Sequence, residues 1–252
     1  MMHPGDLTQD DFLGGQLVLT QPRTGYRAGV DPVFLASAVP AQTGQAVLEL
    51  GCGVGAASLC LGRRIPGLDL YGIERQADHA DLARKNAEDN GISLTVHDGD
   101  LTQMPEILRA RSFDHVIMNP PYFDRARGSM SPHGAREQAM GEETPLAVWL
   151  DQATRRLRPR GLLTMINAAE RLPDILSALD DRLGSVVAQP LSPRTGRAAK
   201  LLLLQARKGG RAAFRLAAPI VLHEGAAHTS DREHYTPAIQ AILRDGAALS
   251  WG

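Results

Sequence analysis

The stretch that decides the fold is QAVLELGCGVGA, residues 45–56. Its first half, Ala46 to Leu50, is a short apolar run of the kind that forms a buried parallel strand. Three glycines then follow at every second position: Gly51, Gly53 and Gly55. They predict a tight turn in which no Cβ blocks an approaching ligand. A helix is expected to begin after the turn, so that its free N–H groups and positive dipole end face that ligand.

Two classes of cofactor bind at a turn of this kind. The spacing Gly51-x-Gly53-x-x-Ala56 satisfies the loose fingerprint of dinucleotide-binding folds, so NAD is one interpretation. Glu49 followed by the alternating glycines resembles motif I of class I S-adenosylmethionine-dependent methyltransferases, so S-adenosylmethionine is a second interpretation. A structural turn without a ligand is the third. Cys52 lies inside the turn, where we expect a small buried side chain next to the cofactor.

Composition describes a globular protein. The chain has 252 residues, of which 43% are hydrophobic and 22% charged, and it is long enough for one large α/β domain. Its two cysteines are too few for a disulfide framework or a zinc site. We see no signal peptide at the N-terminus, and no apolar run approaches the roughly 20 residues that span a bilayer. A cytoplasmic protein without a metal or a membrane partner is expected.

The formal net charge of −1 conceals an uneven distribution. Between residues 155 and 215 the chain has thirteen arginines and lysines against four acidic residues, a net charge of +9, which leaves −10 for the remainder. A basic segment on an acidic body favours a polyanionic partner such as a nucleic acid. The alternative is an ordinary solvated surface in an arginine-rich protein.

Five short apolar runs alternate with helical patterns, which predicts a parallel sheet with right-handed crossovers. These runs lie at residues 46–50, 68–73, 93–97, 113–118 and 161–166. Two further strands, at 186–190 and 201–206, are expected to complete the sheet as an antiparallel pair. Residues 1–12 are polar and are expected to be poorly ordered.

Acidic residues follow the second and third of these strands. Glu74, with Arg75 beside it, ends the second strand roughly 20 residues after the glycine turn, where a carboxylate can accept hydrogen bonds from ribose hydroxyls. This role suits NAD and S-adenosylmethionine equally. Asp100 follows the third strand and can accept the amino hydrogens of an adenine, with Leu101 packing on the ring. Asp98 is the nearby alternative to Asp100.

The fourth strand is followed by Asn119-Pro120-Pro121-Tyr122, at the sheet edge where ligands bind in such folds. An amine bonded to an aromatic ring or a carbonyl is a poor nucleophile, because its lone pair is delocalised. The side-chain carbonyl of Asn119 and the backbone carbonyl of Pro120 can accept its two hydrogens and localise that lone pair. The two prolines stiffen the backbone that aims these acceptors, and Tyr122 offers a flat face for stacking.

Residues 119–122 resemble the [N/D]-P-P-[Y/F] signature of amino-methyltransferases that act on planar amines. This group includes N6-adenine and N4-cytosine DNA enzymes, N2-guanine rRNA enzymes and the release-factor glutamine enzyme. The resemblance favours S-adenosylmethionine over NAD. It implies a class I methyltransferase, Rossmann-like α/β fold: a mostly parallel seven-stranded sheet with an antiparallel last strand and helices on both faces. By the resemblance, Gly51, Gly53, Glu74 and Asp100 bind the cofactor, and 119–122 hold the target amine.

The segment GYRAGVDPVFLA, residues 25–36, narrows the family. It resembles the region before motif I in the bacterial tRNA N6-adenine methyltransferases that modify adenine 37 of a valine tRNA. The resemblance covers about residues 13–208, and it implies that Arg27 and Asp31 lie near the methionine end of the cofactor. We expect an N-terminal extension at 1–40, the methyltransferase domain at 41–210, and a C-terminal extension of that domain at 211–252.

These features together predict methyl transfer from S-adenosylmethionine to the N6 amine of an RNA adenine, in a tRNA. The expected RNA contacts are six basic residues: Arg125, Arg127, Arg136, Arg194, Arg197 and Lys200. A protein-glutamine or rRNA guanine-N2 methyltransferase with the same chemistry is one alternative, and a non-catalytic RNA-binding module is another. We expect a monomer or a weak dimer.

Overall fold

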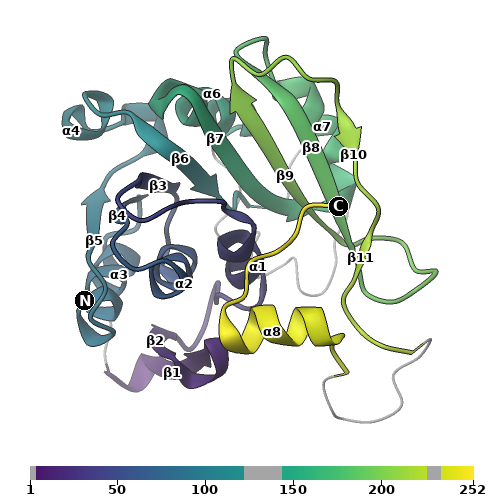
Figure 1. The fold of residues 1–252 in the computed structure, drawn as a ribbon. Helices are drawn as coiled ribbons and strands as arrows, with labels where there is room; N and C mark the ends of the chain where they lie inside the picture. The colour runs from purple at the N-terminus through teal and green to yellow at the C-terminus, as the bar shows by residue number, and fades with distance from the viewer. Residues whose placement is uncertain (1–3, 122–143, 226–233) are drawn as a thin grey trace.

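The computed structural model describes residues 4–121, 144–225 and 234–252. They form one large β-sheet with helices packed on it (Figure 1). Its strand order is β10-β8-β9-β7-β6-β3-β4-β5, and β11 also pairs with β8. The long strands are β3 (Ala46–Leu50), β4 (Asp69–Glu74), β5 (Leu94–Asp98), β6 (Phe113–Met118), β7 (Leu157–Ala168), β8 (Leu183–Ser192) and β9 (Leu201–Lys208). The two short strands are β10 (Arg215–Leu216) and β11 (Ile220–Val221).

Strand direction confirms the predicted mostly parallel sheet. β5, β4, β3, β6 and β7 pair in parallel, whereas β9 runs antiparallel to both β7 and β8. The seven long strands therefore have the expected antiparallel last strand. β10 and β11 widen this sheet to nine strands. Each has only two residues, which is too short to be recognised as a strand from the sequence.

Helices cover both faces of the sheet, as predicted. They are α1 (Asp31–Ala38), α2 (Ala56–Arg64), α3 (Ala77–Asp89), α4 (Glu106–Arg109), α6 (Leu146–Arg156), α7 (Leu172–Ala178) and α8 (Pro237–Asp245). Side chains alternate along β3: Val47 packs in the core with α1 and α2, while Leu48 and Leu50 pack in the core with α6. Figure 1 shows α6 and α7 on the side of the sheet opposite α1 and α2.

The N-terminal residues form a hairpin, so the expectation of poor order over 1–12 is wrong for the described residues. β1 (Leu7–Phe12) pairs antiparallel with β2 (Leu17–Pro22). Asn86 of α3 and Asn90, the residue that follows the helix, then complete the outer edge of β2. Asn86 bonds the N–H and carbonyl of Thr20, and Asn90 bonds those of Val18, at 2.8–3.1 Å. These side chains act as a neighbouring strand would, which polar composition alone does not reveal.

The last residues pack beside α1. Ile239 and Ile242 of α8 are buried in the same core as α1, and the helix ends at Gly246 in the left-handed conformation. The indole N–H of Trp251 donates to the Ala38 carbonyl at 3.0 Å, and the N–H of Gly252 donates to Gln189 at 3.0 Å. These bonds join residues 251 and 252 to α1 and to β8. No helix in the described ranges is long and apolar enough to cross a membrane.

Candidate active site

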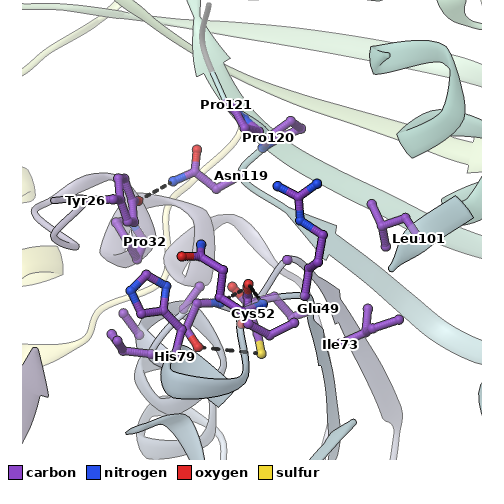
Figure 2. Close-up of a pocket in the computed structure, with 18 of the residues that line it drawn as sticks. Tyr26, Pro32, Glu49, Cys52, Ile73, His79, Leu101, Asn119, Pro120 and Pro121 are labelled. Atoms are coloured by element: carbon purple, nitrogen blue, oxygen red, sulfur yellow. Dashed lines mark hydrogen bonds between the residues drawn. The ribbon is translucent and has the colours of Figure 1, made fainter. Parts of the chain in front are cut away.

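A cavity of about 230 Å³ lies at the carboxyl ends of the parallel strands (Figure 2). The glycine turn after β3, the end of β4, the residues after β5 and the residues after β6 all contribute to its wall. The start of α1 and one side chain of α6 complete it. Because these strands are parallel and adjacent, residues far apart in the sequence meet at one sheet edge, as the sequence predicts.

Two glycines of the turn differ in the space that their surroundings leave for a side chain. Gly51 has φ of +66°, and a Cβ there would lie 2.6 Å from Cη2 of Trp149. Gly53 has φ of +54° and lines the cavity with no heavy atom within 4 Å of the Cβ position. Cys52 is buried beside the cavity, as expected. Gly55 begins α2 and does not line the cavity.

Glu74 connects two backbone segments of the site. Its carboxylate accepts hydrogen bonds from the N–H of Gly53 at 2.9 Å and of Gln76 at 2.8 Å, and the residue is 7% exposed. Each carboxylate oxygen retains a second lone pair that can accept a ligand hydroxyl. Arg75 lines the cavity next to it.

Glu49 lies beneath the turn with 4% exposure. Its carboxyl accepts from the N–H of Ser58 at 2.9 Å and from the Ser58 hydroxyl at 2.5 Å. Burial raises the pKa of Glu49 to about 8, so the group is mainly protonated at neutral pH. The bonds from Ser58 tie the end of β3 to the first turn of α2.

Asp100 and Leu101 line the cavity after β5. Asp100 accepts from both the N–H and the hydroxyl of Thr102 at 2.7 Å, and these bonds lower the pKa of its carboxyl. The Arg75 guanidinium lies 3.9 Å from its other oxygen. Asp98, in contrast, pairs with Arg84 at 2.9 Å and is not part of the cavity wall. This placement favours Asp100 over Asp98.

Asn119 lines the cavity, and its amide has an unpartnered acceptor. Its Nδ2 donates to the Tyr26 hydroxyl at 3.3 Å, which orients the amide as drawn in Figure 2. Its Oδ1 is buried, and no group in the described part of the chain bonds it. A buried acceptor without a partner is costly, so a ligand donor at this position would be favoured. Pro120 and Pro121 also line the cavity, whereas Tyr122 lies outside the described residues.

The segment before α1 contributes in part as expected. Tyr26, Ala28 and Asp31 line the cavity. Arg27 does not line it: its guanidinium pairs with Asp10 of β1 at 2.6 Å. The structure therefore leaves Arg27 away from the expected methionine end.

The basic segment does not form one surface, because its strands cross the sheet in opposite directions. Residues 193–200 connect β8 to β9 at the cavity edge, since Leu201 pairs with Ala168 at the carboxyl end of β7. Arg197 and Lys200 are exposed there, and the Arg194 guanidinium donates to the carbonyls of Glu224 and Gly225. Arg125, Arg127 and Arg136 lie outside the described residues.

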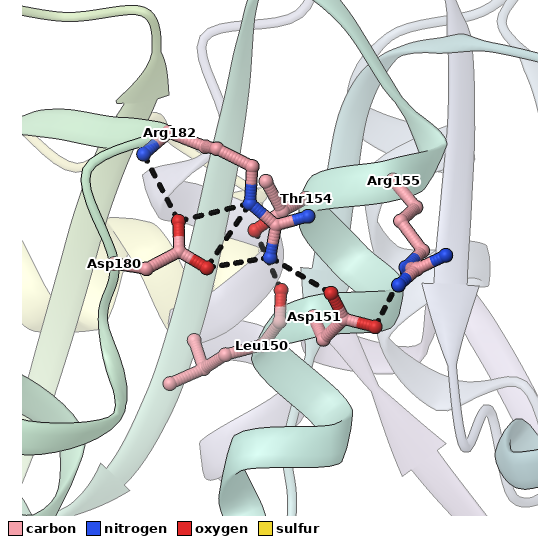
Figure 3. Close-up of polar contacts among 6 residues, drawn as sticks. All are labelled: Leu150, Asp151, Thr154, Arg155, Asp180 and Arg182. Atoms are coloured by element: carbon pink, nitrogen blue, oxygen red, sulfur yellow. Dashed lines mark hydrogen bonds and ion pairs between the residues drawn. The ribbon is translucent and has the colours of Figure 1, made fainter.

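Other cations of the segment lie at the opposite edge and are paired (Figure 3). Arg182 bonds both Asp180 at 2.5 Å and Asp151 at 2.7 Å, and Arg155 bonds Asp151 at 2.7 Å. The bond from Arg182 lowers the pKa of Asp180. This network fastens α6 to the residues before β8. The basic residues of 155–215 are therefore divided between the two edges of the sheet.

Sequence reasoning missed several residues at this site, among them Trp149, Tyr26 and Asn167. Trp149 is 8% exposed and lines the cavity, and its indole N–H has no partner in the described ranges. Tyr26 holds the Asn119 amide, and Asn167 donates to the Pro120 carbonyl at 3.3 Å. Asn167 carries a recognisable signal, because it is a polar residue at the carboxyl end of an apolar strand. Nothing local marks Trp149 or Tyr26 as site residues.

In the part of the chain that the structure describes, no three His, Cys, Asp or Glu side chains cluster as they would around a metal ion.

Comparisons with known proteins identify the family. Residues 28–188 match the model of the methyltransferase small domain. A Porphyromonas gingivalis protein called tRNA1(Val) (adenine(37)-N6)-methyltransferase is 31% identical over 180 residues, which cover 66% of this chain and 68% of the relative. A Dickeya chrysanthemi protein of the same name is 25% identical over 248 residues, 96% of each chain.

Solved structures agree on the fold. A protein of Agrobacterium tumefaciens described as a predicted O-methyltransferase has a TM-score of 0.71 and 27% identity, over 87% of this chain and 98% of the other. The Thermus thermophilus 16S rRNA N2 G1207 methyltransferase, solved with S-adenosylmethionine and guanosine, has a TM-score of 0.55 and 20% identity, over 80% of this chain and 50% of the other. The chain therefore belongs to the methyltransferase small domain family and is an S-adenosylmethionine-dependent methyltransferase.

Proposed function

We propose that this methyltransferase modifies the exocyclic N6 amine of an adenine in RNA, and that the RNA is a tRNA with its target at adenine 37. The observation that carries the reaction type is the buried, unpartnered Oδ1 of Asn119 at the cavity wall. The RNA and its position rest on the names of relatives at 25–31% identity.

The cavity fits the cofactor through groups that this chain supplies. Gly53 leaves open space at its Cβ position, so a ligand can contact the turn directly. The Glu74 carboxylate is placed to accept ribose hydroxyls, and Asp100 with Leu101 to receive the adenine. When bound, S-adenosylmethionine supplies an electrophilic methyl group on a sulfonium.

Asn119 and Pro120 act on the target amine. The N6 lone pair of adenine is delocalised into the ring. The Asn119 amide oxygen and the Pro120 carbonyl accept one amine hydrogen each and direct the lone pair at the methyl group. As the new N–C bond forms and the bond between the sulfonium sulfur and the methyl group breaks, positive charge develops on the amine, and these preorganised acceptors stabilise it more strongly than they stabilise the ground state. The methylated amine then releases one proton to water. Positioning and hydrogen bonding thus account for the rate increase, without a general base.

RNA reaches the site at the carboxyl edge of the sheet. The target adenine leaves its stack to enter the cavity, which a base in a loop does at lower cost than one in a duplex. Arg197 and Lys200 are exposed at the same edge and can neutralise phosphates beside the target. Arg194, together with Arg125, Arg127 and Arg136, completes the proposed RNA contacts.

A protein-glutamine target and a guanine N2 target use the same acceptor chemistry. The names of the relatives favour adenine over both. A non-catalytic RNA-binding module would have no need of an unpartnered Asn119 acceptor beside the cavity.

The test is methyl transfer from labelled S-adenosylmethionine to separate pools of tRNA, rRNA, DNA and protein, followed by nucleoside and amino-acid analysis. We expect label in tRNA as N6-methyladenosine. A valine tRNA transcript with guanine in place of adenine 37 is the matched control and should accept no label. Label that appears mainly in protein glutamine or in guanine contradicts the proposal.

A further inference from the structure

The Pro120 carbonyl is reached by a second buried amide. Backbone pairing between β6 and β7 is in register as far as Met118 and Met165. Beyond this point Pro120 and Pro121 have no backbone N–H, so they cannot donate further main-chain hydrogen bonds to β7. Asn167, near the end of β7, supplies a hydrogen bond in their place: its Nδ2 donates to the Pro120 carbonyl at 3.3 Å.

The Asn167 side chain is fixed at both ends. It is 1% exposed, and its Oδ1 accepts from the N–H of Ala168 at 2.9 Å. Because a backbone N–H can only donate, Oδ1 must face Ala168 and Nδ2 must face Pro120. The amide therefore cannot flip without losing both bonds.

We propose that Asn167 is a positioning residue for methyl transfer: it holds the Pro120 carbonyl at the angle that presents its free lone pair to the substrate amine. A carbonyl oxygen has two lone pairs, and Asn167 occupies one. Proline fixes φ, so the direction of the carbonyl depends on ψ of Pro120, which the Asn167 bond restrains. The inference rests on the proposed function, because it requires that a substrate amine binds at the Pro120 carbonyl. It holds for an amine of adenine, guanine or glutamine alike.

This restraint differs from the Tyr26 contact at the neighbouring residue. Tyr26 orients the Asn119 amide by accepting from its Nδ2, whereas Asn167 orients a backbone carbonyl by donating to it. The two acceptors proposed for the amine are thus each held by a separate group, from the segment before α1 and from β7. Errors of about 1 Å in such positioning cost on the order of 100-fold in rate.

The experiment compares Asn167→Asp, Asn167→Ala and the control Gln189→Ala in single-turnover methyl transfer at saturating cofactor and substrate. Gln189 is also a buried amide that donates to a backbone carbonyl, that of Ala218, and it does not line the cavity. Asn167→Ala should lose on the order of 10- to 100-fold in single-turnover rate at every pH, and Asn167→Asp should lose as much where its carboxyl is ionised. The dissociation constant for S-adenosylhomocysteine should change less than about twofold, and Gln189→Ala should keep the wild-type rate.

The pH dependence of the Asn167→Asp rate distinguishes a lost hydrogen bond from a change in packing. The shape is retained, but an ionised carboxylate cannot donate to Pro120, whereas a protonated carboxyl can. The rate of Asn167→Asp relative to wild type should therefore rise as pH falls. If Asn167→Ala, which cannot donate at any pH, folds with near-native thermal stability and transfers methyl groups at the wild-type rate, the inference is wrong.

A measurement without substrate separates this inference from the proposed function. In ¹⁵N NMR spectra of the cofactor-free protein, the side-chain NH₂ pair that disappears in Asn167→Asp should exchange slowly with solvent. Rapid exchange would contradict the hydrogen bond itself, whatever the substrate. If the wild type methylates protein instead of RNA, the proposed function fails. The same variants are then compared on the protein substrate. A wild-type rate for Asn167→Ala on that substrate overturns the role of Asn167.

Discussion

At the scale of single residues, Glu49 is a carboxyl group buried where charge is costly. Its pKa is raised to about 8, mainly by burial, against an ordinary value of 4.5. Between these values the folded protein holds a proton that the unfolded chain releases. The free energy of unfolding therefore falls as pH rises from about 4.5 to 8, with a slope of at most about 1.4 kcal/mol per pH unit. Below this window the contribution is fully present.

Glu49→Gln removes this titration while keeping the shape. Urea unfolding of both proteins between pH 5 and 9 should show the difference, wild type minus variant, becoming less favourable as pH rises and levelling off above about 8. His115, whose pKa burial lowers to about 4, contributes the opposite slope at acid pH, but equally in both proteins. Parallel stability curves for the two proteins would show that Glu49 is already ionised in the native state.

At the scale of elements, α6 packs directly on the glycine turn. The Trp149 ring occupies the space that a Cβ on Gly51 would need, at 2.6 Å, and the left-handed φ of Gly51 adds strain for any other residue. Gly51→Ala should therefore displace α6, weaken cofactor binding by roughly tenfold or more, and lower stability by about 1–3 kcal/mol.

Trp149 also provides the readout for that variant. In a Trp251→Phe background Trp149 is the remaining tryptophan, so its fluorescence reports the cavity. Titration with S-adenosylhomocysteine should change this emission in the background protein and require more ligand in Gly51→Ala. Gly44→Ala is the control, because Gly44 also has positive φ but no heavy atom within 4 Å of its Cβ position. Equal ligand affinity in the two variants would contradict the packing argument.

At the scale of the whole molecule, the basic segment is divided between the two sheet edges. Arg197 and Lys200 lie at the cavity edge, whereas Arg160 and Arg211 lie near the opposite ends of the same strands and are exposed. Arg197→Ala with Lys200→Ala should weaken RNA binding and reduce the slope of log affinity against log salt by about 1 for each phosphate that is no longer neutralised.

Arg160→Ala with Arg211→Ala removes the same charge from the far edge and is the matched control. Affinity and salt slope should stay near the wild-type values in that variant. If the two double variants lose affinity equally, RNA binding follows net charge and not the cavity edge.

Much of this organisation is readable from the sequence because parallel strands bring their carboxyl ends to one edge. That rule places Gly53, Glu74, Asp100 and Asn119 around one cavity before any coordinates are known. It fails for contacts that depend on packing between distant segments. Asn119 forms a hydrogen bond with Tyr26, which is 93 residues away in the sequence, and Pro120 forms one with Asn167, which is 47 residues away. Neither pairing has a local pattern.

The same limit explains why the expected poor order of residues 1–12 was wrong and why the sequence does not reveal how the basic charges are divided. β1 is polar but ordered, because it pairs with β2, and the outer edge of β2 is in turn held by Asn86 and Asn90, residues far along the chain. The basic segment is continuous in sequence but crosses the sheet three times, which separates its charges in space. The sequence shows where charged residues lie along the chain. A binding surface depends instead on which strand ends lie next to one another in the fold.

The central claim is that Asn119 acts on the amine as methyl transfer occurs, and Asn119→Ala tests it most directly. In single-turnover methylation of tRNA transcripts at saturating cofactor, the variant should lose on the order of 10²–10³-fold in rate, while its affinity for S-adenosylhomocysteine stays nearly unchanged. Asn119→Asp, which keeps an acceptor at the same place, should retain more activity than alanine. Methylation by Asn119→Ala at the wild-type rate would contradict the account.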